Sequence, residues 1–133
     1  MSVDLVGRGQ EFVEFWTERR LASLTSVRPD GRPHVVPVGV TVDFERGLAR
    51  VITRRHSVKA RLVAGAGVTG LAVAVCQFEG AHWSTLEGRA VLRDDAESVA
   101  VAVARYARRY RQPKESPERV VLEIVVERVL GNR

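Results

Sequence analysis

The amino-acid sequence predicts a mainly β domain, a small antiparallel barrel of six strands with helices packed against its outside. Six short segments are rich in β-branched and apolar residues, and turn signals such as the Pro-Asp-Gly at 29–31 separate them. Only three segments are helical, too few for the regular alternation of a doubly wound parallel sheet. We therefore expect residues 1–133 to form one domain, with residues 1–8 as a loose N-terminal arm.

The expected elements are a helix over 9–20, strands over 21–27, 34–42 and 48–53, a helix over 57–65, strands over 70–76 and 83–92, a helix over 94–111 and a strand over 119–130. In the first helix, Phe12, Phe15 and Trp16 share one face, which predicts packing on the core. Asp94, followed three residues later by Glu97, has the spacing of a capping box and predicts the start of the last helix.

Composition excludes several classes of protein. Apolar residues make up 45% and charged residues 28% of the chain, as in globular domains, and no apolar run is long enough to cross a membrane. The single cysteine, Cys76, excludes an internal disulfide framework, and the three histidines are scattered, so we expect no metal site. The hydrolase motifs GxSxG and HExxH do not occur. A cytoplasmic protein with no membrane partner is the expectation.

The chain is basic, and nearly all of its cations are arginine. Lysine and arginine total 21 against 16 acidic residues, a net charge of +5, and only Lys59 and Lys114 are lysines. The arginine excess alone is also what a biased genome composition would give. The charge suits nucleic acid, an anionic cofactor or an acidic protein surface. Because the aromatic residues do not alternate with cations as in RNA-binding motifs, we expect no nucleic-acid partner.

The segment 53–61 predicts an anion site. A strand ends at Thr53, and Ser57 is a suitable N-cap for the helix that follows. Cations precede and enter the first helical turn, including Arg54 and Lys59, where the helix dipole disfavours positive charge. A bound phosphate would use the free amides and the cations together. The alternative is a solvated basic turn.

The strand at 34–42 carries a second signal. Its even-numbered valines, including Val36 and Val38, point to one side and predict barrel core. The other side carries Pro37 and Gly39, which weaken strand pairing and leave room for a flat ligand close to the backbone. An edge strand with a bulge explains the same residues.

The last helix ends in a cluster of arginines. Arg105, Arg109 and Arg111 form a basic wall that would receive carboxylates of a substrate or of a cofactor tail. The alternative is that these cations simply complement the negative end of the helix dipole.

Several stretches resemble those of a known family. They are LASLTSVRPDGRPHVVPVGVTVD, LARVITRRHSVKARLV, WSTLEGRAVL and RVVLEIVVERVLG, and together they span nearly the whole chain. They are similar to the pyridoxamine-phosphate-oxidase-like split β-barrel flavoproteins, and within them to the branch of F420-dependent biliverdin reductases. The resemblance implies a six-stranded split barrel of the FMN-binding type that forms a homodimer, with two cofactor sites at the subunit interface.

The resemblance also implies which residues bind coenzyme F420, a deazaflavin. The expected contacts are His34, Val35, Val36, Pro37, Val38, Gly39, Ile52, Thr53, Arg54, Ser57, Lys59, Ala60 and Trp83. The ring would lie along 34–39, and the basic loop would hold the phosphate. This agrees with the anion site inferred from the residues alone.

The implied activity is transfer of a hydride from reduced F420 to a conjugated acceptor, with biliverdin reduced to bilirubin as the leading case. The sequence identifies no catalytic acid. FMN in the same groove, as in a pyridoxamine-phosphate-oxidase-like oxidoreductase, is one alternative. A non-catalytic protein that binds a tetrapyrrole or the cofactor is another.

Overall fold

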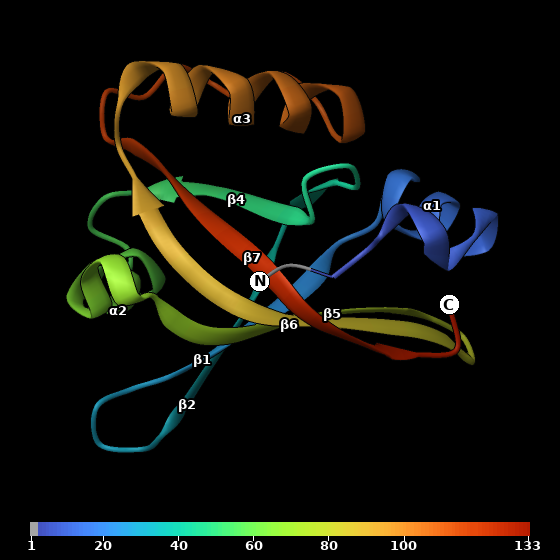
Figure 1. Ribbon diagram of the computed structural model, residues 1–133. Coiled ribbons are helices and arrows are strands. Elements are labelled where there is room, and N and C mark those ends of the chain that lie inside the picture. Colours follow the sequence, from blue (N-terminus) through green and yellow to red (C-terminus); the bar gives the residue numbers. More distant parts are fainter. Residues whose placement is uncertain (1–2) are drawn as a thin grey trace.

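The computed structural model describes residues 3–133. Its elements in chain order are η1 (Val6–Arg8), α1 (Gln10–Thr17), β1 (Ala22–Val27), β2 (Pro33–Val38), β3 (Val40–Asp43), β4 (Leu48–Arg54), α2 (Val58–Ala66), η2 (Gly67–Thr69), β5 (Leu71–Glu79), β6 (His82–Arg93), α3 (Ala96–Arg109) and β7 (Arg119–Gly131). Figure 1 shows a curled sheet, in which β6 and β7 are long strands that run diagonally across the view, with helices outside it. None of the described helices has the length and apolarity needed to cross a membrane.

The sheet is antiparallel throughout, with the strand order β2-β1-β5-β6-β7-β4-β3. The mainly β antiparallel prediction is confirmed, but the described chain has seven strands rather than six. The expected strand 34–42 is interrupted at Gly39, so that β2 pairs with β1 while β3 pairs with β4. The two outermost strands are therefore consecutive in the chain. Gly39 turns the backbone from one end of the curled sheet to the other.

The core lies inside the curl and is covered by α1. Phe12 and Trp16 are almost fully buried, as the helical spacing predicted, and the Trp16 Nε1–H donates to Ser84 Oγ at 3.0 Å. Burial alternates along β1, with its inward side chains buried and the intervening ones half-exposed. The helix ends at Thr17 rather than at residue 20, because Glu18 adopts an extended backbone conformation.

The N-terminal segment is docked rather than loose where it is described. Residues 1 and 2 of the expected arm lie outside the described residues. The Val3 amide donates to the carbonyl of Val126 at 3.1 Å, and Leu5 is completely buried in the core. The apolar side chain at position 5 holds residues 3–8 against the curled sheet, since its burial stabilises the fold by about 2 kcal/mol.

The helices α2 and α3 both begin with a side-chain cap. Ser57 Oγ accepts a hydrogen bond from the Ala60 amide, which confirms Ser57 as the N-cap of α2. The cap of α3 is Asp95, one residue later than expected, and its carboxylate accepts from the Ser98 amide at 3.0 Å. Hydrogen bonding with Ser98 lowers the pKa of Asp95 below its ordinary value.

Candidate functional site

A pocket of about 300 Å³ lies where the ends of β2 and β4 and the start of β7 meet α2 and α3. Its lining residues are Pro37, Val38, Gly39, Ile52, Thr53, Arg54, Lys59, Tyr106, Pro113 and Arg119. Seven of these ten are residues that the sequence suggested for the cofactor. The strand break at Gly39 and the loop before α2, far apart in sequence, are thus brought to one place by the fold.

Two other expected residues, Ser57 and Ala60, do not line the pocket but support the residues that do. Ser57 Oγ accepts from the Ala60 amide and from Thr53 Oγ1, the latter at 3.0 Å. Ala60 is buried beneath the first turn of α2. These contacts fix the helix start relative to the end of β4, which sets the position of Lys59.

The remaining expected residues lie away from this pocket. His34 and Val36 are half-buried further along β2, and the Val35 side chain is 58% exposed on the outer face. Trp83 stands at the far end of β6, paired in register with Phe78. His34 lies opposite Ser26, and His34 Nδ1 and Ser26 Oγ are buried without a hydrogen-bond partner among the described residues.

Three cations in the pocket have no acidic partner. Arg54, Lys59 and Arg119 form no ion pair within 4 Å in the part of the chain that the structure describes, and nearby Glu118 pairs with His56 at 3.2 Å. Arg54 and Arg119 are directly opposite each other across β4 and β7. Like charges in that arrangement destabilise a sheet. The arrangement therefore favours a bound anion.

The environment of Lys59 strengthens this conclusion. Partial burial lowers the pKa of its ammonium below the ordinary value. The amides of Val58 and Lys59, in the first turn of α2, have no acceptor among residues 3–133. A phosphate here would meet ammonium, guanidinium and free N–H groups together.

Two tyrosines explain the glycine at position 39. A Cβ at Gly39 would lie 2.8 Å from Tyr106 Cε2 and 3.2 Å from Tyr110 Cε2, so only glycine lets the rings pack this closely. Tyr110 Oη accepts from the Val40 amide at 3.1 Å and donates to the carbonyl of Arg20. The sequence suggested room for a flat ligand at Gly39; the tyrosines of α3 fill the side toward which a Cβ would point, so only the pocket-facing side of this backbone is open to a ligand.

Tyr106, Pro113 and Arg119 line the pocket but were not among the expected residues. The i, i+4 spacing of Tyr106 and Tyr110 is visible in the sequence, yet it does not reveal which strand the pair contacts. Arg119 is identifiable only from the pairing of β7 with β4, which places it beside Arg54.

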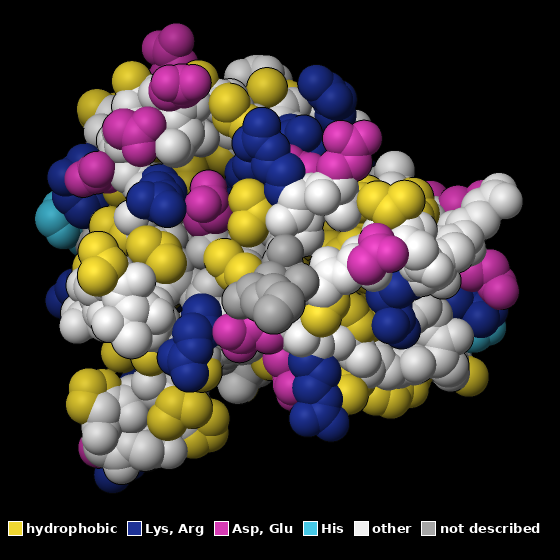
Figure 2. Space-filling model, in the orientation of Figure 1, with side chains coloured by type: hydrophobic (Ala, Val, Ile, Leu, Met, Phe, Trp, Pro, Cys, Tyr) yellow, Lys and Arg dark blue, Asp and Glu magenta, His cyan; other side chains and the backbone are white. Residues whose placement is uncertain are grey.

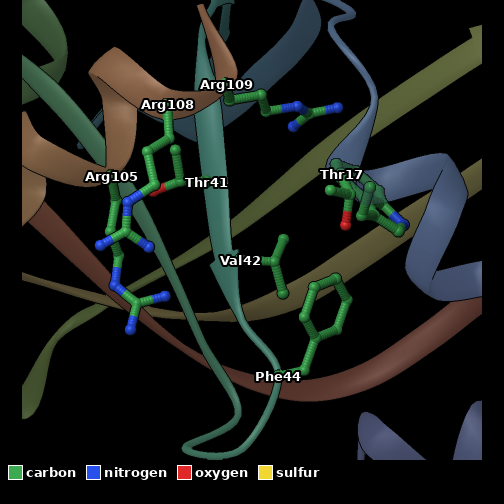
Figure 3. A pocket seen from close by; sticks show the side chains of 8 residues that line it. Thr17, Thr41, Val42, Phe44, Arg105, Arg108 and Arg109 are labelled. Atoms are coloured by element: carbon green, nitrogen blue, oxygen red, sulfur yellow. The ribbon is translucent and has the colours of Figure 1, made fainter.

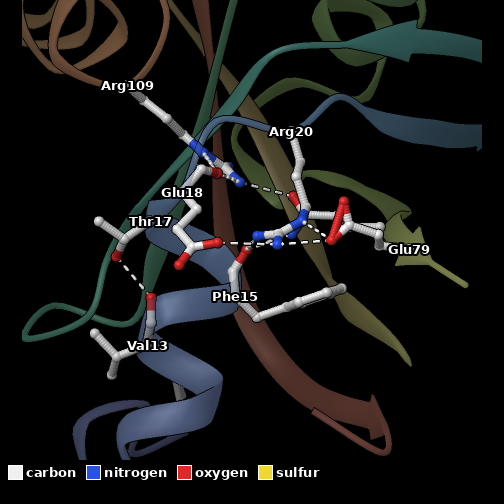
Figure 4. A network of polar contacts seen from close by, with 8 residues as sticks. Val13, Phe15, Thr17, Glu18, Arg20, Glu79 and Arg109 are labelled. Atoms are coloured by element: carbon white, nitrogen blue, oxygen red, sulfur yellow. Dashed lines mark hydrogen bonds and ion pairs between the residues drawn. The ribbon is translucent and has the colours of Figure 1, made fainter. Parts of the chain in front are cut away.

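The expected basic wall at the end of α3, Arg105, Arg109 and Arg111, does not line the pocket beside Lys59. Arg109 is buried and donates twice to the carbonyl of Glu18, to the carbonyl of Val40, and to Gln77 Oε1 at 2.8 Å. Figure 4 shows this guanidinium reaching the end of α1, where Glu18 and Arg20 also meet. Burial lowers the pKa of Arg109. Its guanidinium thus joins α3, α1 and the sheet.

The other two arginines lie in different surroundings. Arg105 contacts Asp43 Oδ2 at 3.4 Å, and Arg111 is exposed beyond the end of the helix. Within residues 3–133, no group of three or more histidine, cysteine or acidic side chains is placed to hold a metal ion. The pocket beside Lys59 is therefore the strongest candidate site.

Comparison with known proteins agrees with the fold. The family model described as pyridoxamine 5'-phosphate oxidase matches residues 9–133. A Mycobacterium tuberculosis protein named F420H(2)-dependent biliverdin reductase is 50% identical over 118 residues, which cover 89% of this chain and 83% of that protein. The solved structure of an F420 reductase superposes with a TM-score of 0.72 at 18% identity, covering 92% of this chain and 98% of that one.

A conserved hypothetical protein from Mycobacterium tuberculosis has a TM-score of 0.77 at 21% identity, covering 98% of this chain and 88% of the other. At these identities the solved structures support the fold alone. The family match and the 50% identical relative each cover most of the sequence. The chain therefore belongs to the pyridoxamine 5'-phosphate oxidase family.

Proposed function

We propose that the protein is a reductase that transfers a hydride from reduced coenzyme F420 to a conjugated acceptor, with biliverdin the leading substrate. The observation that carries this proposal is a set of three cations, Arg54, Lys59 and Arg119, that have no acidic partner within the described residues and lie in a pocket bordered by β2. The name of the 50% identical relative supports the choice of coenzyme and acceptor.

The residues present fit a flat cofactor with an anionic tail. Arg54, Lys59 and Arg119 would hold the phosphate, assisted by the free amides of α2. The ring would lie along 37–39 on one side and beside Ile52 on the other. When bound, the reduced coenzyme supplies the hydride.

The chain's own contribution is binding and orientation. The cations fix the charged part of the cofactor, and the edge of β2 presents its backbone to the ring. Thr53 Oγ1 already donates to Ser57 Oγ, so it serves to fix the helix start and is not the acid. The proton that accompanies the hydride comes from solvent, so the acceptor gains two electrons and two protons in net terms.

We further propose that the protein is a homodimer, with the outer face of β2, β1 and β5 as its interface. Two rows of side chains across these strands carry no charge, namely Val35, Thr25 and Ala74, and Pro37, Ser23 and Cys76. Figure 2 shows hydrophobic side chains gathered on the projecting β1–β2 hairpin, where Val27 and Val35 are 50% and 58% exposed. Pro37 belongs both to this face and to the pocket, so a partner there would lie beside the cofactor.

Light scattering tests the dimer. Val35→Lys should shift the protein from dimer to monomer at micromolar concentration, because it places a charge in the uncharged face. Val68→Lys is the matched control, since Val68 is 96% exposed in η2 and lies outside that face. A monomeric parent protein, or a dimer that Val35→Lys leaves intact, would contradict this interface.

The activity is tested by mixing the protein with reduced F420 and biliverdin and following oxidation of the deazaflavin by its absorbance. We expect turnover with F420 and none when FMN replaces it. Preference for FMN in fluorescence titrations would favour the FMN-dependent alternative. Tight binding of F420 or biliverdin without turnover would instead favour a carrier.

A further inference from the structure

A second hollow lies on the other side of the α3 C-terminal half, between α3, β3 and the end of α1. Figure 3 shows Arg105 and Arg108 descending from α3 beside β3, opposite Thr17 of α1. The hollow measures about 230 Å³, and an adjoining one of about 390 Å³ shares Val42, Phe44 and Arg105 with it. We call the first hollow, lined by Trp16, Thr17, Thr41, Val42, Phe44, Arg105, Arg108 and Arg109, the α1–α3 groove.

The groove combines an apolar floor with a cationic rim. Val42 and Phe44 supply the floor, and Trp16, only 1% exposed, borders it. Phe44 packs edge-on against Phe12 at 6.1 Å between ring centroids. Arg108 is exposed and has no acidic partner within 4 Å in the described range. Among residues 3–133, no acidic side chain lines the groove itself, although Asp43 and Glu45 line the adjoining hollow.

The nearest carboxylate, that of Asp43, already lies close to several arginines. Asp43 Oδ2 lies 3.4 Å from both Arg50 and Arg105 and 3.9 Å from Arg46. One negative charge therefore faces three guanidinium groups, and Arg108 adds a fourth cation nearby. The local excess of positive charge is what an organic anion would balance.

We propose that the α1–α3 groove binds a small aryl carboxylate, with its ring on the floor formed by Phe44 and Val42 and its carboxylate on Arg108 and Arg105. The volume is below the roughly 300–1,000 Å³ of sites for drug-sized ligands, so the ligand has one or two rings. A planar carboxylate matches the geometry of a guanidinium group. The aromatic ring of Phe44 favours contact with an aromatic ring of the ligand. This site is separate from the pocket beside Lys59 and does not depend on the proposed function.

Nuclear magnetic resonance tests the proposal with 2-naphthylacetate as the probe. The variant Trp83→Phe leaves Trp16 as the only indole, so its side-chain N–H signal reports on the groove floor. We expect that signal to shift and saturate with 2-naphthylacetate, and uncharged 2-naphthylacetamide to bind about tenfold or more weakly.

Two arginine variants complete the test. Arg108→Ala should weaken binding of the acid about tenfold, whereas Arg111→Ala, an exposed cation outside the groove, should leave it unchanged. Equal binding of acid and amide would overturn the proposal. So would an unmoved Trp16 signal, or equal effects of the two variants. Naphthylacetate binding that Lys59→Ala abolishes would assign it to the other pocket and would equally overturn the proposal.

Discussion

Replacing Lys59 with alanine tests the anion site directly, because this lysine lines the pocket and makes no ion pair with any described residue. A charge-assisted hydrogen bond to a phosphate contributes about 1.5–3 kcal/mol, so the dissociation constant for F420 should rise about 10- to 100-fold. Burial lowers the pKa of Lys59, which means that the unliganded fold is destabilised by keeping this ammonium charged. The melting temperature of the unliganded variant should therefore stay the same or rise.

Lys114 provides the matched control, since it is the only other lysine, is exposed and does not line the pocket. Titration of each variant with F420, followed by deazaflavin fluorescence, gives the affinities, and thermal unfolding without ligand gives the stabilities. Unchanged affinity in Lys59→Ala, or an equal loss in Lys114→Ala, would refute the reasoning. A large fall in melting temperature would show that Lys59 supports the fold instead.

Three further outcomes are expected. Gly39→Ala should destabilise the protein by about 1–3 kcal/mol in urea unfolding, because the new Cβ would lie 2.8 Å and 3.2 Å from the two tyrosine rings. Gly65→Ala is the control: it has open space around it and should stabilise α2 by up to about 1 kcal/mol. Arg109→Ala should cost on the order of 3 kcal/mol of unfolding free energy and Arg111→Ala less than about 0.5 kcal/mol; equal costs would contradict the structural role of Arg109. As the pH rises through the lowered pKa of Lys59 toward 10.5, the affinity for the coenzyme should fall, because Lys59 loses its charge. The stability of the unliganded protein should rise over the same range, because Lys59 keeps its proton to higher pH in the unfolded chain than in the folded one. Lys59→Arg should remove both trends.

The strand boundaries illustrate what local sequence can and cannot predict. The alternation of valines over 34–42 correctly predicts extended backbone, and the presence of Pro37 and Gly39 correctly marks that strand as irregular. The exchange of partners at Gly39, from β1 to β4, takes place where the tyrosines of α3, some seventy residues later, pack against this glycine. Local patterns carry no information about such a distant contact.

The two groups of cations show the same limit. The loop before α2 was predicted as an anion site from capping and dipole arguments, which are local, and the structure places Arg54 and Lys59 in one pocket. The arginines of α3 looked equally available for a ligand. Arg109 is instead used by carbonyls at the end of α1 and by Gln77, groups that only the tertiary fold brings near it.

The positions of residues at the ends of the strands depend on strand pairing. Arg119 joins the pocket because β7 places it opposite Arg54, and this register cannot be read from either segment alone. Trp83 and Val35, expected beside the cofactor, lie instead on exposed outer surfaces of the single chain. Their contact with a cofactor stays a prediction that depends on the proposed dimer.

The most direct measurement is a crystal structure of the protein grown with F420. We predict density for the coenzyme phosphate between Lys59, Arg54 and Arg119, with the ring along 37–39. Coenzyme bound at another surface, with these three side chains left in contact only with solvent, would contradict the central claim.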